Sequence, residues 1–161
     1  MKEKIMGVYE KLTAMLVWPQ SLFLLGVRLM WGWGFIGTGS GKLMHLERTV
    51  GYFKDLGIPL PQVNALLASG TELAGGVLLV LGLGSRLISV PLICTMLVAY
   101  ATAEHEALLS LFSSDNSKFF EAAPWPFLFA CLIVLLFGPG KFSVDTLMGR
   151  CGARCCGQDK K

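Results

Sequence analysis

Charged residues are scarce in this sequence, and several long stretches contain none. Lysine, arginine, aspartate and glutamate make up 16% of the 161 residues, hydrophobic residues make up 53%, and the mean hydropathy is +0.60. Soluble domains average about 25% charged residues, so the composition favours a membrane protein over a soluble one. The net charge of +3 is small, and the lack of a basic face with interleaved aromatic residues argues against nucleic-acid binding.

Signatures of secretion and of built-in redox chemistry are also missing. No A-x-A-like cleavage site follows the first apolar run, which is too long for the core of a signal peptide, so we expect a retained first membrane helix. The sequence lacks C-x-x-C, a flavin fingerprint and paired histidines at haem-ligating positions inside its apolar segments. We therefore expect no covalently bound cofactor, and any electron transfer would need an extrinsic one.

Four apolar segments approach the length of about 20 residues that a helix needs to cross a bilayer core of ~30 Å. They are residues 20–41, 62–84, 86–103 and 122–138. The fourth is short, with Pro124 and Pro126 at one end and the sequence GPG at the other. Residues 1–150 are therefore predicted to form an all-α, four-transmembrane-helix bundle, followed by a short Cys-rich tail at residues 151–161.

The distribution of positive charge predicts the orientation of this bundle. With four spans both termini share a side, and nine lysines and arginines fall on that side against four on the other. The positive-inside rule then places both termini and the tail in the cytoplasm. The outer loops, "HLERTVGYFKDLGIPLP" and "EHEALLSLFSSDNSKFF", look like amphipathic segments. They lie either on the membrane surface or over the mouth of the bundle.

Two opposite charges are expected deep inside neighbouring antiparallel spans. Arg28 lies about 12 Å and Glu72 about 18 Å from the cytoplasmic ends of their segments, at ~1.5 Å per residue. An unpaired charge in a membrane costs several kcal/mol, so we predict that the two side chains pair. Small residues on the same faces, including Gly32 and Gly76, would allow the close helix contact that this needs.

The sequence leaves the purpose of this polar pair open. A buried ion pair can simply fix the register of two helices. Ionisable residues inside a membrane also mark functional sites by default, and a polar pocket here would suit a quinone headgroup, a small sulfur species or a proton.

Several motifs together resemble the DoxX family of small bacterial membrane proteins. They are "LLGVRLMWGWGFIGTGSGKL", "YFKDLGIPLP", "ASGTELAGGVLLVLGLGSRL" and "FGPGKFSVDTLM", in the family's order and over about residues 21–148. The matching positions are Arg28, Gly32, Gly37, Lys42, Gly57, Pro59, Glu72, Gly76, Gly82, Arg86, Gly138, Pro139, Gly140 and Asp145.

The resemblance implies a four-helix protein of the bacterial inner membrane, surrounded by the lipid bilayer and associated with redox chemistry. Family members are linked to quinone-coupled sulfur oxidation, as partners of thiosulfate:quinone oxidoreductases, and to oxidative and thiol stress as membrane anchors of redox enzymes. The expected function is a quinone- or thiol/sulfur-redox-associated subunit that acts with a partner protein. The alternatives are a non-catalytic anchor or assembly factor, or a small-molecule transporter. A G-x-x-x-G face at Gly37 to Gly41 would permit a homo-oligomer.

The motif "GPGKFSVD" predicts a sharp turn after the last span. Gly138, Pro139 and Gly140 end the helix, and Ser143 and Asp145 can then cap a short cytoplasmic segment. Asp145 is also expected to pair with Arg86 at the cytoplasmic surface, as a weak surface pair or as a tighter structural contact.

The remaining candidates are histidines and cysteines. His45 and His105 are expected near the outer mouth, as ordinary interfacial residues, as a proton entry or quinone-headgroup partner, or as part of a metal site. Cys94 and Cys131 are expected to be small apolar fillers. Cys151, Cys155 and Cys156 form either a flexible tail or a thiol or soft-metal site, although their spacing is not that of a strong zinc motif.

Overall fold

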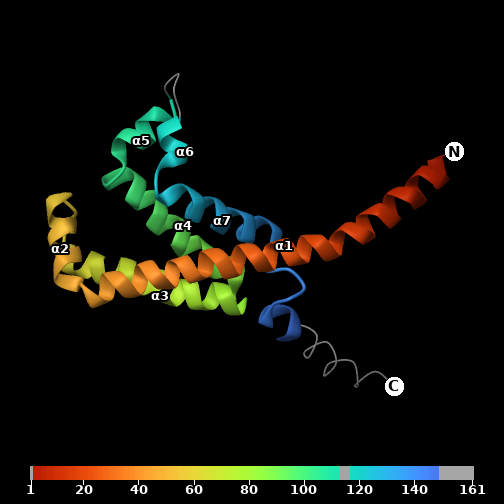
Figure 1. The fold of residues 1–161 in the computed structure, drawn as a ribbon, viewed down its shortest axis with the longest axis horizontal. Coiled ribbons are helices and arrows are strands. Elements are labelled where there is room, and N and C mark those ends of the chain that lie inside the picture. Colours follow the sequence, from red (N-terminus) through yellow and green to blue (C-terminus); the bar gives the residue numbers. More distant parts are fainter. Residues whose placement is uncertain (1, 113–116, 149–161) are drawn as a thin grey trace.

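The computed structural model describes residues 2–112 and 117–148, and within these ranges the chain is all-helical (Figure 1). Its helices are α1 (Lys2–Met44), α2 (Leu46–Asp55), α3 (Pro61–Leu81), α4 (Ser85–Thr102), α5 (His105–Ser110), α6 (Ser117–Glu121) and α7 (Pro124–Phe137). The all-α prediction is confirmed for this part of the chain.

Three helices in the described residues are long and apolar enough to cross a membrane. They are Trp18–Met44 of α1, Pro61–Leu81 and Ser85–Thr102. The fourth predicted segment forms α7, an apolar helix of 14 residues, which spans about 21 Å. Its length therefore falls short of the bilayer core that the other three match.

The first and third helices pack against each other as a close antiparallel pair (Figure 1). A Cβ atom added at Gly76 would lie 2.7 Å from the carbonyl oxygen of Gly32, and one at Gly39 would lie 2.5 Å from the amide nitrogen of Leu73. Glycine is needed at these crossings because the opposing atoms belong to backbone. Gly32 and Gly76 lie in the contact as predicted, whereas Gly37 is exposed and has open space around it.

The fourth and seventh helices form a second pair, extended by α5 and α6 (Figure 1). The ring of Tyr100 stacks on Phe119 with centroids 4.8 Å apart, and its hydroxyl donates to the carbonyl of Phe119 at 2.8 Å. Trp125, at the start of α7, packs against Phe119 and Phe120. These aromatic contacts tie α6 to the ends of α4 and α7.

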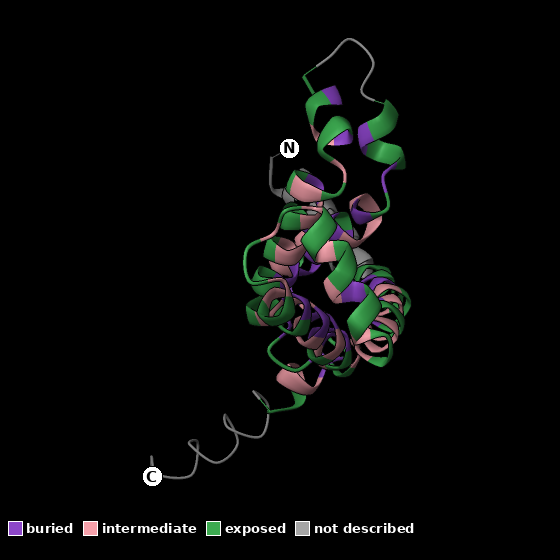
Figure 2. Cartoon of the chain, turned by 90° about the vertical axis from the view of Figure 1, so that its left-hand side faces the viewer, coloured by how far each residue is buried: buried purple, intermediate pink, exposed green. Residues whose placement is uncertain are grey.

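The buried residues lie mainly where the helices contact one another (Figure 2). Phe35, Leu79, Leu92 and Val134 are fully buried, while large apolar side chains such as Leu87 cover the outer faces. An apolar exterior suits a lipid environment. The bilayer core offers no hydrogen-bond partners, and the helices satisfy their backbone polar groups internally.

Candidate functional site

Arg28 of α1 is buried beside the end of α3 and, within the part of the chain that the structure describes, bonds only to backbone carbonyls. Its Nε donates to Leu79 at 2.9 Å, and its Nη2 donates to Val80 at 3.1 Å. Its Nη1 donates to Pro139 at 2.6 Å and to Phe142 at 3.0 Å. The last carbonyls of a helix lack intrahelical partners and carry partial negative charge, so α3 offers a cation site where it ends.

The predicted pairing of Arg28 with Glu72 is therefore wrong, although both side chains are buried, each with 1% exposure. The depth estimate assumed that the first span begins near residue 20. In the structure α3 ends beside Arg28, so the arginine lies at the end of the α1–α3 contact and not at its middle. Glu72 is eleven residues into α3 from Pro61, about 16 Å along the helix axis.

The turn between α3 and α4 is shaped around the arginine. Gly82 has a φ of 71°, and an added Cβ would overlap the Arg28 guanidinium. Gly138 and Gly140, with φ of 80° and 76°, allow the chain after α7 to turn back and present the carbonyl of Pro139. The predicted turn at Gly138, Pro139 and Gly140 thus contributes directly to the arginine site.

Asp145 caps α4 instead of pairing with Arg86. Its carboxylate accepts from the amides of Gly84 at 2.8 Å and Ser85 at 3.2 Å, which are among the free donors at the start of a helix. The exposed Arg86 instead makes one long contact, from Nη2 to the carbonyl of Leu136 at 3.5 Å. The predicted surface pair of Asp145 and Arg86 is therefore wrong, because the α4 amides take both carboxylate oxygens.

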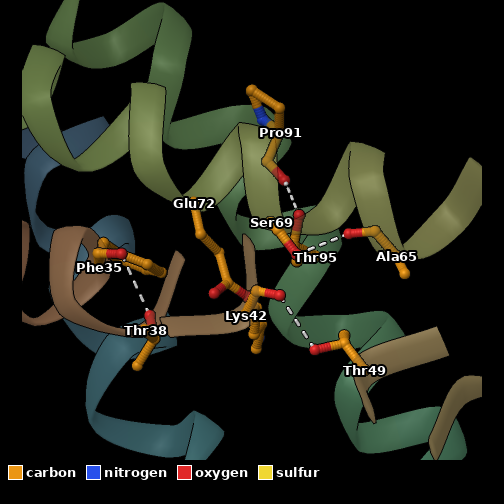
Figure 3. Close-up of polar contacts among 9 residues, drawn as sticks. All are labelled: Phe35, Thr38, Lys42, Thr49, Ala65, Ser69, Glu72, Pro91 and Thr95. Atoms are coloured by element: carbon orange, nitrogen blue, oxygen red, sulfur yellow. Dashed lines mark hydrogen bonds and ion pairs between the residues drawn. The ribbon is translucent and has the colours of Figure 1, made fainter. Parts of the chain in front are cut away.

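Glu72 pairs with Lys42, a residue predicted from the sequence only as a position that matches the family. The Lys42 ammonium lies 2.6 Å from Glu72 Oε1, and the lysine side chain is 37% exposed. The second carboxylate oxygen, Glu72 Oε2, is buried and has no hydrogen-bond partner among the described residues. Figure 3 shows Glu72, on α3, pointing toward Lys42, which lies in the last turn of α1.

This pair lies in a cavity of about 700 Å³ between α2, α3 and α4. The walls are mainly apolar, with Phe53, Leu67 and Val98 among the lining residues. Besides the Lys42–Glu72 pair, the polar lining residues are Arg48, Thr49, Tyr52, Asn64, Thr71, Thr95 and Thr102. Volumes of about 300–1,000 Å³ with apolar walls and a few converging polar groups are typical of small-molecule sites.

The buried carboxylate oxygen makes this cavity a candidate site. Leaving a buried acceptor without a donor costs about 1–3 kcal/mol, so an unsatisfied buried carboxylate oxygen calls for an explanation, such as a bound molecule. A ligand that brings a hydroxyl or an N–H to Glu72 Oε2 would remove that cost. An acceptor on the same ligand could reach the ammonium of Lys42.

The other sequence candidates lie outside this cavity, except Cys94. His45 and His105 are both exposed, next to α2 and at the start of α5, and neither lines the cavity. Cys94 is exposed and lines it, whereas Cys131 is buried. Cys151, Cys155 and Cys156 lie outside the described residues, among which no group of three potential ligands could hold a metal ion.

Sequence reasoning missed the cavity because three separate helices build it. A usable signal was Lys42, a lone lysine at the end of a long uncharged run that begins after Arg28. Such a lysine could reach back along α1 toward a buried acid. The sequence contains no information on the distances between helices, so it could not identify Glu72 as the acid that pairs with Lys42.

The chain is similar to known membrane proteins. The sequence is 29% identical over 153 residues to the uncharacterized membrane protein Rv3486 of Mycobacterium tuberculosis, covering 85% of this chain and 94% of that protein. No solved structure matches. The DoxX family model matches residues 23–105, a range that contains the Arg28 site on α1 and α3 and both members of the Lys42–Glu72 pair. The chain belongs to the DoxX family.

Proposed function

We propose that this protein is a quinone-binding membrane subunit of a thiol- or sulfur-redox system and that the cavity holds the quinone headgroup. The observation that supports it best is the unpartnered Glu72 Oε2 beside the Lys42 ammonium, at the polar part of an otherwise apolar cavity. A quinol hydroxyl would donate to Glu72 Oε2, and a quinone carbonyl would accept from Lys42. The apolar walls suit the ring and the start of an isoprenoid tail.

The two side chains also suit the proton chemistry of a quinone. Oxidation of a bound quinol releases two electrons and two protons. In this proposal Glu72 accepts one proton, water at the exposed side of Lys42 accepts the other, and a partner redox protein accepts both electrons. Reduction runs the same steps in reverse, with the partner as donor.

The proposed setting is the inner membrane of a bacterium. We place α7 as a fourth span that crosses a locally thinned bilayer, a known response to short helices, and both termini in the cytoplasm. Reporter fusions after Lys54, Arg86 and Met148 would test this topology. The proposal requires a cytoplasmic reporter signal at Arg86 and Met148, and an external one at Lys54.

Direct binding to the purified full chain in nanodiscs tests the quinone site, with decylubiquinone as the probe. We expect saturable binding that weakens at least tenfold in Glu72→Gln and in Lys42→Met. The matched controls Glu121→Gln and Lys54→Met change exposed residues outside the cavity and should bind like the wild type. Absent saturable binding, or equal binding by all five proteins, would overturn the proposal.

Cys94 provides a second readout of occupancy. In a variant with Cys151, Cys155 and Cys156 changed to serine, decylubiquinone should slow alkylation of Cys94 by N-ethylmaleimide. The quinone ring is fully substituted and does not itself add to the thiol. The buried Cys131 should stay unmodified throughout, which reports that the fold is intact.

A further inference from the structure

A second cavity, of about 490 Å³, lies at the opposite end of the bundle beside the Arg28 site. Its wall combines the end of α3 with the chain that follows α7. Leu81 and Leu147 present apolar side chains there, and both are more than half exposed. Trp18 and Phe142 also line the cavity and meet edge to face, with centroids 6.0 Å apart.

The depth of this cavity places it at the membrane boundary. The helix α3 has 21 residues and is about 31 Å long, which matches the hydrocarbon core. Val80 and Leu81 end that helix and line the cavity. Trp18 belongs to the same wall, and tryptophan is enriched at the headgroup level.

The charges around the cavity are mostly positive. Lys141 lines it, is exposed, and forms no ion pair with any other described residue. Arg86 is exposed at the same end, next to Gly138. The carboxylate of Asp145 is already occupied by the two amides of α4. Arg28 adds positive charge from within, although its donors are taken by carbonyls.

We infer that this cavity binds one anionic phospholipid. The phosphate lies at Lys141, and an acyl chain follows the apolar wall of Leu81 and Leu147 toward the bilayer core. The neighbouring Trp18 and Phe142 pack against the glycerol region. Basic pockets between membrane helices on the cytoplasmic side bind acidic lipid headgroups in this manner. The inference is independent of the quinone site, because the two cavities share no lining residue, and it uses only the proposed cytoplasmic placement of this end of the bundle.

Lipid retention by the purified full chain tests this inference. Native mass spectrometry of protein extracted from mixed micelles should show retained phosphatidylglycerol in preference to phosphatidylcholine with the same acyl chains. Losing one lysine contact should reduce that preference about fivefold in Lys141→Gln. The matched control Lys118→Gln removes an exposed lysine from α6 and should leave the preference unchanged.

Four outcomes would overturn the inference. The first is equal retention of the two lipids by the wild type. The second is an equal loss of preference in Lys141→Gln and Lys118→Gln. The third is covalent cross-linking through Leu147→Cys to a second copy, in the same yield with and without phosphatidylglycerol, which would assign the surface to a dimer contact. The fourth is competition by free inorganic phosphate at the same concentration as the lipid, which would assign the cavity to a plain anion.

Discussion

The two buried charges of this bundle have opposite kinds of surroundings. Four backbone carbonyls from two separate segments surround the Arg28 guanidinium, so nearly all of its five donors are used. Glu72 has one partner and one unused oxygen, beside a cavity. A saturated charge locks the structure, whereas a half-satisfied charge is available to a ligand. The position of a charge inside a membrane therefore says less about its role than the count of its partners.

Removal of the Arg28 side chain should have the largest effect on stability. In Arg28→Met, the carbonyls of Val80, Pro139 and Phe142 lose the guanidinium donor, whereas Leu79 keeps the amide of Gly82. An unsatisfied buried carbonyl costs about 1–3 kcal/mol. We expect a loss of more than about 3 kcal/mol, or failure to recover folded protein. Arg28→Lys should rescue only part of it, because an ammonium cannot reproduce the planar fork.

The measurement is reversible unfolding in mixed detergent micelles, followed by circular dichroism. Arg86→Met is the control, since Arg86 is exposed and makes one long contact. Equal destabilisation by Arg28→Met and Arg86→Met would show that the hydrogen bonds of Arg28 do not stabilise the fold more than an exposed arginine does.

The close contact of α1 and α3 should come next. In Gly76→Ala the new methyl group would meet the backbone of Gly32 and Ile36 at 2.7 and 2.8 Å, so the helices must move apart. Overpacking of this kind costs about 1–3 kcal/mol. Gly37→Ala places the same methyl in open space and should leave the unfolding midpoint unchanged or raise it slightly. A Gly37 effect as large as that of Gly76 would argue for an undetected packing partner, as in an oligomer.

The cap of α4 should contribute less. Asp145→Ala frees the amides of Gly84 and Ser85, and loss of a helix cap costs about 1 kcal/mol. Asp145→Asn keeps an acceptor and should restore most of the stability. The same unfolding assay measures both variants, and an Asn variant no better than the Ala variant would mean that the charge of Asp145, near Arg28, matters more than its hydrogen bonds.

Part of this arrangement could be predicted from the sequence. Hydropathy located the long apolar helices. The cost of a lone charge in lipid led to the wrong partners for Arg28 and Glu72, although both side chains are buried. Small residues identified the α1–α3 contact at Gly32 and Gly76. Each of these features depends on local composition or on one helix face.

The partners of the charges could not be predicted, because they depend on the axial offset between helices. Hydropathy assigns a segment to the membrane without fixing which residue of one helix lies beside which residue of the next. In the structure α3 ends beside Arg28. The partners of Arg28 are therefore backbone carbonyls and not the predicted carboxylate of Glu72. The turn after α7, far away in the sequence, supplies the other two carbonyls.

Replacement of Glu72 should have the smallest effect on stability and the largest on ligand binding. Glu72→Gln removes a buried charge whose second oxygen is unpaired, and Lys42 keeps access to water. We expect a stability change of less than about 1 kcal/mol, because the lost ion pair and the relieved desolvation offset each other. Decylubiquinone should raise the unfolding temperature of the wild type but not of this variant. If decylubiquinone raised the unfolding temperature of Glu72→Gln as much as that of the wild type, Glu72 would serve only the fold, as Arg28 does.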